Sequence, residues 1–357
     1  MTMLSPGPLG AAAPRTDGPP TSPPLVAPEP PLPTPRGPVS EVLLDHLRLP
    51  VHDLPPLPEA LDDAITGEDA PLALHVLYEL HYRGFDGVDE AWEWEPSLLR
   101  ERQRLERAFE ERLVELAGPI PMGLSPDGVR TELLELSSED EDATLSALVA
   151  REGTVEQVRE LLVHRSAYQL KEADPHTFGI RRLWGRGKAA MVEIQRGEYG
   201  DGRPDEVHAT LFAGAMEELG LDSAYGALVD EIPGVTLSTG NLISLFGLHR
   251  RWRGALVGHL ALFEMCSVRP MGRYLAALER LGFAGGPAAR FYEAHVEADA
   301  HHAVVALEDM VGGLLEEEPA LGGEIVFGAR ALGAVEGAFS TRVRRSWAAG
   351  ETSLRRP

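Results

Sequence analysis

The sequence is poor in residues that several classes of protein require. Cys266 is the one cysteine in 357 residues, so no disulfide forms within the chain, and we expect a reducing, cytoplasmic setting. Lys and Arg number 33 against 56 Asp and Glu, and this net charge of −23 argues against a nucleic-acid partner, because phosphate contacts need clustered cations. No apolar run reaches the roughly 18 residues that a membrane helix needs, and the first residues lack a signal-peptide pattern.

Aromatic residues are also scarce, at 6% of the chain, whereas Ala and Leu are abundant. This bias favours helices over β-sandwiches, whose strands are rich in aromatic and β-branched residues. Hydrophobic residues make up 43% of the chain, which is normal for a protein with a packed core. With no strand pattern or repeat in the sequence, we expect an all-α fold.

Proline and glycine divide the chain into segments. Prolines crowd residues 1–38 and predict a disordered tail, because they lack the backbone donor that helices and sheets need; a docking role for this tail is left open. The runs GPIPMGLSPDG and SSEDEDATL predict a linker at 119–143. It separates an N-terminal helical segment, 39–118, from a larger helical domain, 144–347, and we expect 348–357 to fray.

Helical periodicity and breaker residues predict the positions of the helices in both segments. The expected helices are at about 40–47, 71–82, 96–116, 141–151, 154–173, 187–198, 205–219, 221–230, 238–267, 270–281, 286–315 and 319–345.

The strongest chemical signal is the stretch FYEAHVEADAHHAVVAL, in which His295, Asp299 and His302 lie at positions i, i+4 and i+7. On a helix these side chains form one stripe about 10 Å long. Two imidazoles and a carboxylate suit iron, manganese or zinc. His301 points elsewhere on this helix. The alternative is a polar helix face in contact with water.

A second signal is Glu264, which lies in the apolar stretch ALVGHLALFEMCS. A buried carboxylate needs a cationic partner, which is either a metal or an Arg from another helix. His259 in the same stretch is expected to lie in the core or to support a ligand, and Cys266 to pack as a small hydrophobic residue.

Two further stretches offer carboxylates and an imidazole. Glu198 and His208 flank the interruption YGDGRP, which re-aims the chain so that both can point inward, and Glu193 is an alternative carboxylate. Earlier in the chain, Glu172 lies at the end of a helix that Pro175 stops. Taken alone, Glu198 and Glu193 are compatible with surface positions, and Glu172 is uninformative.

The combination is more informative than any single stretch. Carboxylates that bridge two cations and imidazoles that complete their coordination are the ligands of di-iron helical bundles. The Glu-x-x-His motif of ferritin-like proteins is absent from these stretches.

The stretches resemble the haem-oxygenase-like di-iron oxidases and oxygenases, also called iron-containing redox enzymes. The resemblance covers about 164–310 and is carried, in the family's order, by HRSAYQLKEADPHTFGIRRLWG, KAAMVEIQRGEYGDG, VHATLFAGAMEELGLDSAYG, NLISLFGLHRRWRGALVGHLALFEMCS and FYEAHVEADAHH. The stretch LYELHYRGFDGVDEAWEWEP is similar to a dimer-forming segment of some members, which implies a homodimer.

The resemblance implies a fold, a ligand set and a reaction. The fold is a haem-oxygenase-like helical bundle, with His295, Asp299 and His302 holding one iron and His208 serving the other. The complete implied ligand set is Glu172, Glu198, His208, Glu264, His295, Asp299 and His302.

The implied reaction is oxidation of a small organic substrate by O2 through a peroxo-di-iron(III) intermediate, with two iron ions and an external reductant. N-oxygenation, desaturation and oxidative C–C cleavage are the implied outcomes. Tyr168, Tyr199 and Trp184 lie near ligand stretches and either line the cavity or pack. The alternatives are a metal-free or haem-handling protein of the same fold, a helical interaction protein, and a ferritin-like protein.

Overall fold

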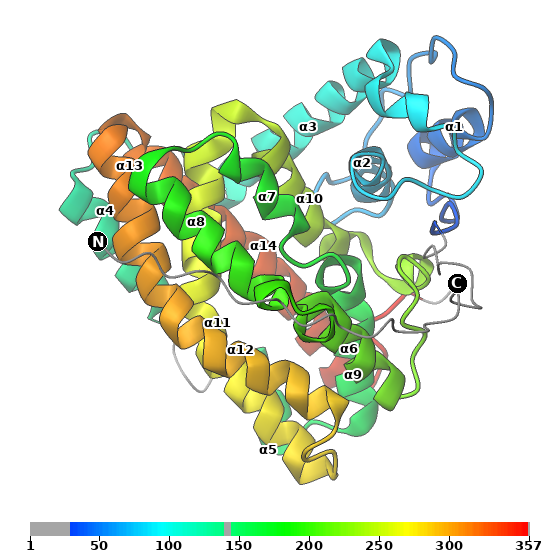
Figure 1. The fold of residues 1–357 in the computed structure, drawn as a ribbon. Coiled ribbons are helices and arrows are strands. Elements are labelled where there is room, and N and C mark those ends of the chain that lie inside the picture. Colours follow the sequence, from blue (N-terminus) through cyan, green and yellow to red (C-terminus); the bar gives the residue numbers. More distant parts are fainter. Residues whose placement is uncertain (1–28, 139–143, 356–357) are drawn as a thin grey trace, which may run out of the picture.

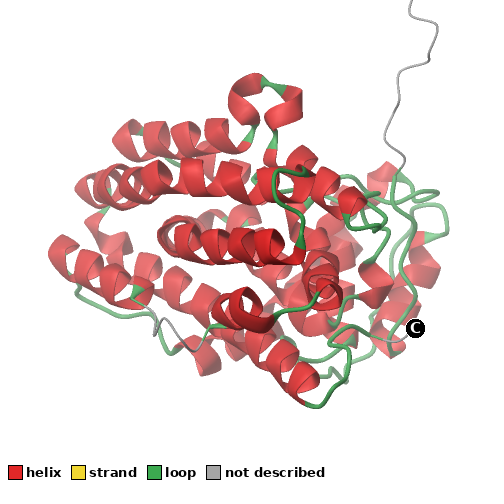
Figure 2. Cartoon of the chain, turned by 90° about the horizontal axis from the view of Figure 1, so that it is seen from below, coloured by secondary structure: helices red, strands yellow, loops and turns green. Residues whose placement is uncertain are grey.

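The computed structural model describes residues 29–138 and 144–355, and every regular element in these ranges is helical (Figure 2). No helix in this part of the chain is both long enough and apolar enough to cross a membrane. The α-helices are α1 (Pro38–Leu47), α2 (Asp69–Glu79), α3 (Pro96–Ala117), α4 (Pro126–Ser137), α5 (Leu145–Glu152), α6 (Val155–Gln169), α7 (Asp174–Ile180), α8 (Gly185–Glu198), α9 (His208–Glu218), α10 (Gly234–Leu248), α11 (Arg253–Leu281), α12 (Pro287–Val304), α13 (Gly312–Glu317) and α14 (Gly322–Ala348).

Local sequence accounts for where several helices begin. Pro38, Pro96 and Pro126 occupy first helical positions, where the missing N–H is not needed. Thr154 caps α6 in a reciprocal arrangement with Gln157, in which each side chain accepts from the other residue's backbone N–H. These signals are local, and for this reason the helical segments could be predicted well.

The long helix α11 forms the centre of the bundle and packs against α12 and α14 (Figure 1). A π-helical stretch, Val305–Val311, continues α12 into α13 and packs along α8. Helices α6 and α9 lie at the other end of α12. Helices α1, α2 and α3 lie on one side of the bundle, where α2 packs on α10 and α3 packs on α14.

The N-terminal helices share one hydrophobic core with the bundle. Leu43 and Phe109 from the N-terminal helices belong to the same buried cluster as Phe246 and Phe327 from α10 and α14. The segment predicted at 39–118 is therefore helical but is packed against the larger domain. We call residues 29–118 the N-terminal unit.

Three expectations about irregular segments are wrong where the structure describes them. Residues 29–38 of the predicted tail pack against the protein, with Thr34 bonded to Asp230, while 1–28 lie outside the described residues. The predicted linker at 119–143 contains α4, because Ser125 caps it and its apolar side chains pack against α14. The predicted frayed end, 348–357, is docked as far as 355, because the Ser353 hydroxyl is buried and donates to Glu160.

Helix boundaries differ in two further places. The helix expected at 238–267 is interrupted between α10 and α11. Helix α11 continues through Pro270, because packing on several sides offsets the lost hydrogen bond and the ring clash of one proline. The helix expected at 221–230 is irregular, because Asp222 bonds the backbone of Ala224 and Gly226 has a φ of 74°.

Helices α11 and α14 approach so closely that only glycine fits at Gly258. A Cβ at this position would lie 1.8 Å from the Ile325 carbonyl oxygen. We predict that Gly258→Ala lowers the free energy of unfolding by about 1–3 kcal/mol or prevents folding, because the neighbour is backbone that cannot rotate away. Gly272→Ala in the same helix is the control, since nothing lies within 4 Å of its Cβ and alanine favours helix. Urea unfolding of both variants measures the difference, and equal stability would contradict the close approach.

Candidate metal centre

The seven residues predicted to bind metal come from five segments and converge in the interior. All of them are at most 7% exposed. Glu172 lies in the turn after α6, Glu198 is the last residue of α8, His208 is the first residue of α9, Glu264 lies in α11, and His295, Asp299 and His302 lie in α12.

The side chains form two overlapping groups, and Glu198 belongs to both. The first group is Glu172, Glu198, His208 and His295, and the second is Glu198, Glu264, Asp299 and His302. Within each group, one possible ligand atom per residue lies within 4.8 Å of all the others. Such spacing suits one cation in each group.

The two carboxylate oxygens of Glu198 face different groups. Oε2 lies 2.7 Å from Nδ1 of His208, and Oε1 lies 3.3 Å from Nδ1 of His302. Nδ1 of His302 also lies 3.5 Å from Oε2 of Glu264. Glu198 is therefore placed to bridge two cations.

Several of these atoms are buried without a hydrogen-bond partner, although charged atoms lie nearby. They are Oε2 of Glu172, Nδ1 of His208, Oδ2 of Asp299 and Nδ1 of His302. Nδ1 of His208 is close to Glu198 but lacks hydrogen-bond geometry. Buried polar atoms normally have a hydrogen-bond partner. Because these atoms converge without bonding to each other, a pair of bound cations would supply the partners that they lack.

The backbone also makes room for the cluster. A Cβ on Gly197 would lie 2.5 Å from Nε2 of His302, so only glycine allows this imidazole to approach α8 so closely. Between Glu198 and His208 the chain makes two short 3₁₀ turns, with Gly200 and Asp201 at φ values of 61° and 55°. This interruption turns the chain so that both side chains point inward, as the sequence predicted.

The division of α12 between two groups differs from the expected one. His295, Asp299 and His302 were expected to hold one iron together, but His295 lies with His208 and Glu172. The stripe spans about 10 Å along the helix, whereas donors to one ion lie only about 4 Å apart. One turn of helix is enough to place His295 in the neighbouring group.

The other candidates from the sequence lie outside the cluster. Glu193 and His301 pair with each other on the surface, with their side chains 55% and 66% exposed. His259 is buried in the core and contacts His176 at 3.3 Å. Cys266 packs half-buried against the hydrophobic core.

The three aromatic candidates have different positions. Trp184 is 47% exposed. The Tyr199 hydroxyl donates to Oδ1 of Asp174 at 2.7 Å. Tyr168 lines a small cavity beside the cluster.

Sequence reasoning missed several residues that line this cavity, among them Gln195, Phe263 and His176. Gln195 is 3% exposed, and neither its amide nitrogen nor its amide oxygen has a hydrogen-bond partner. Its position one turn before Glu198 was the available signal, because residues three apart share a helix face. The cavity leaves room for little more than a water molecule.

Burial and mutual repulsion favour the protonated forms of two of the carboxyl groups, Glu264 and Asp299. Burial raises the pKa of Glu264 to about 7, and the charge of Glu198 adds to the shift. Burial also raises the pKa of Asp299 to about 7, and Glu264 contributes. Burial acts in the same direction on Glu198, but the neighbouring His208 outweighs it, so that the pKa of Glu198 is lowered.

The imidazoles of α12 respond to these carboxylates. Burial lowers the pKa of His295, but the charge of Glu172 reverses the shift and raises it to about 10. Burial lowers the pKa of His302 as well, and contacts with Glu198 and Glu264 raise it to about 10. The site without metal therefore holds protons that a cation must displace.

Fold and site together define an all-helical protein with a buried carboxylate and imidazole cluster suited to two cations. The family model of the iron-containing redox enzymes matches residues 159–337, which is half of the chain and includes all seven residues. The chain therefore belongs to this family, and the predicted haem-oxygenase-like all-α fold is confirmed. Among curated proteins, none matches this chain.

We predict that metal affinity rises between about pH 6 and pH 8, roughly tenfold per pH unit for each proton displaced. Glu264, Asp299, His295 and His302 have raised pKa values in the folded protein, so they bind more protons there than in the unfolded chain. Their contribution to the stability of the metal-free protein is therefore present at low pH and is lost as the pH rises through about 7 and then about 10. Titration with Mn(II) at several pH values, with proton release followed by a dye, measures how the metal affinity changes with pH. Affinity that does not change with pH would contradict it.

Proposed function

We propose that this protein is a non-haem di-iron oxidase or oxygenase that uses O2 to oxidise a small organic substrate. The observation that carries the proposal is Glu198, whose two oxygens face two separate groups of buried carboxylates and imidazoles. A carboxylate shared in this way is the bridging ligand of a two-metal site.

The charges of the cluster match two divalent cations. The two groups contain four carboxylates, Glu172, Glu198, Glu264 and Asp299, and three imidazoles that bind metal in the neutral form. Two Fe(II) ions would neutralise the carboxylates, whereas burial of the carboxylates alone is unfavourable. When bound, the iron pair supplies the electrons with which dioxygen is activated.

The residues around the cavity would control what reaches the iron pair. Leu260 and Phe263 present apolar surface that excludes water from one side. The free amide of Gln195 offers two N–H donors and a carbonyl acceptor to a polar group of an incoming molecule. Because the cavity is so small, we expect it to widen when an organic substrate binds.

N-oxygenation, desaturation and oxidative C–C cleavage are the reactions that we propose as candidates for the substrate. We also propose an external electron donor, since a single cysteine cannot hold an iron–sulfur cluster. A homodimer and a cytoplasmic location complete the proposal.

The geometry favours this proposal over its rivals. A haem or metal-free protein of this fold would leave the four buried carboxylates of the cluster without cations. A protein that uses these residues for surface contacts would expose them, but they are buried. A ferritin-like protein would mineralise iron without consuming an organic substrate, which product analysis distinguishes.

Ligand variants test the two-metal arrangement. We predict that the wild-type protein binds about two Fe(II) per chain, that His208→Ala binds about one, and that Glu198→Ala binds neither tightly, because Glu198 serves both groups. Anaerobic Fe(II) titration with metal analysis measures the stoichiometry. Glu193→Ala and His301→Ala are the controls, because this exposed pair lies outside both groups. Unchanged iron content in Glu198→Ala would contradict the arrangement.

Mixing the anaerobic Fe(II) protein with O2 tests the proposed chemistry. We expect a transient visible absorption band that does not form in Glu198→Ala. A folded wild-type protein that takes up two iron ions but shows no reaction with O2 would overturn the proposed oxygen chemistry.

A further inference from the structure

Glu172 differs from the other six candidate ligands because no helix holds it. Helix α6 ends at Gln169 and α7 begins at Asp174, so Glu172 lies in the turn between them. The backbone N–H of Glu172 reaches the Gln169 carbonyl at 3.3 Å, which is a long hydrogen bond. The position of this carboxylate therefore depends on what holds the turn.

The turn also contains backbone strain. Ala173, directly after Glu172, has a φ of 75°, in the left-handed region that residues with a Cβ rarely adopt. Such a conformation persists only where surrounding contacts impose it. Contacts outside the turn must therefore supply the constraint.

Lys171, directly before Glu172, supplies such a contact on the other side of the chain. Its ammonium pairs with Oε1 of Glu79 in α2, and the two side chains are 2% and 3% exposed. The same ammonium lies 4.3 Å from the centre of the Tyr82 ring. Lys171 is thus bound to the N-terminal unit, while Glu172 faces His208 and His295 of the cluster.

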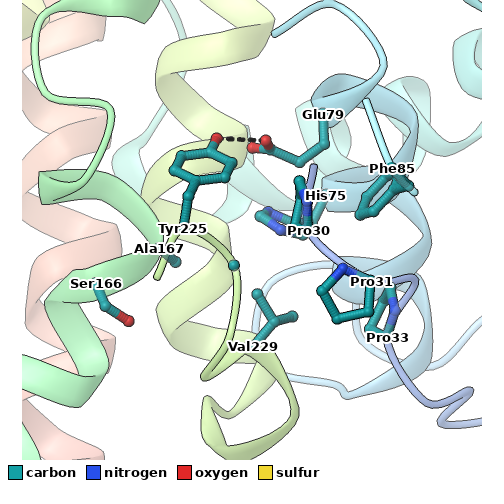
Figure 3. Close-up of a pocket in the computed structure, with 11 residues that line it drawn as sticks. Pro30, Pro31, Pro33, His75, Glu79, Phe85, Ser166, Ala167, Tyr225 and Val229 are labelled. Carbon is teal, nitrogen blue, oxygen red and sulfur yellow. Dashed lines mark hydrogen bonds between the residues drawn. The ribbon is translucent and has the colours of Figure 1, made fainter. Parts of the chain in front are cut away.

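Further residues surround Glu79 and bond to it. The hydroxyl of Tyr225 donates to Oε2 of Glu79 at 2.5 Å (Figure 3). His75 lines a small cavity beside this bond together with Pro30, and the carbonyl of Pro30 accepts from the backbone of Asp86 at 2.9 Å. In such a setting an ion pair is screened little by solvent and keeps a fixed geometry.

We propose that the N-terminal unit positions the metal ligand Glu172 through the buried ion pair of Glu79 and Lys171. The inference rests on the proposed function, and it assigns a role to a residue that lies outside the family match at 159–337. Glu79 is a positioning residue, because it acts on the first group of ligands through Lys171 and the strained turn.

The replacement Glu79→Gln tests the inference, because it removes the charge and preserves the shape. We expect binding of one of the two Fe(II) ions to weaken by about tenfold or more, as for residues that orient metal ligands, while the other changes less than about twofold. In a His302→Ala background, only the first group of ligands is intact. There we expect Glu79→Gln to weaken the binding of the one remaining Fe(II) ion. In a His208→Ala background it has little effect.

Two further variants separate positioning from folding. If Glu79→Gln does not fold, the double variant Glu79→Leu with Lys171→Met replaces the pair with apolar side chains, an exchange that buried pairs often tolerate. We expect this double variant to keep a thermal midpoint close to that of the wild type and still to bind one of the two Fe(II) ions more weakly. Tyr225→Phe removes only the hydrogen bond to Glu79. We expect it to lower the Fe(II) affinity of the same site by a smaller factor.

Glu106→Gln is the matched control. Glu106 is a buried carboxylate of α3 that accepts from His249 of the bundle at 2.9 Å and from Tyr78 at 3.1 Å. Its replacement should lower the thermal midpoint but leave both iron affinities within about twofold.

The outcomes distinguish this inference from the proposed function. Normal binding of both ions in folded Glu79→Gln or in the double variant would overturn the positioning role alone. An equal loss of Fe(II) affinity in Glu106→Gln would also overturn it, because a general destabilisation of the fold would then explain the weaker binding. A wild-type protein that binds no iron would overturn the proposed function and, with it, this inference.

Discussion

The structure depends on how four carboxylates can be buried together. Glu172, Glu198, Glu264 and Asp299 surround one small interior region, and the imidazoles among them are neutral when they bind metal. Buried anions are unfavourable unless cations or protons meet them. Burial raises the pKa of Glu264 and Asp299, which favours their protonated forms in the chain without metal. Divalent cations satisfy the same requirement and release those protons.

The rest of the fold supports this cluster. Glycines allow α11 and α14 to approach each other closely, which fixes the helix that carries Glu264. Another glycine, Gly197, lets His302 reach α8. Glu172, Glu198 and His208 lie where helices end or begin, because chain breaks allow side chains from neighbouring helices to point at one place. The N-terminal unit shares the core of the bundle and contacts the turn that carries Glu172.

The sequence could predict the helical class and all seven residues of the cluster, because both depend on local spacing or on the family resemblance. It could not predict how these seven residues divide between two groups, since the grouping of His295 with His208 depends on how α9 approaches α12. Nor could it predict the pairing of Lys171 with Glu79, which are far apart in the chain. Proline-rich composition suggested a free tail, but contacts such as that of Thr34 with Asp230 are tertiary and leave no local pattern.

Anomalous scattering at the iron edge, from crystals loaded with Fe(II) under anaerobic conditions, tests the central claim most directly. The account predicts two peaks about 3.5–4 Å apart, with Glu198 between them. One peak lies beside His208 and His295, and the other lies beside Asp299 and His302. A single peak, or peaks away from these side chains, would contradict the account.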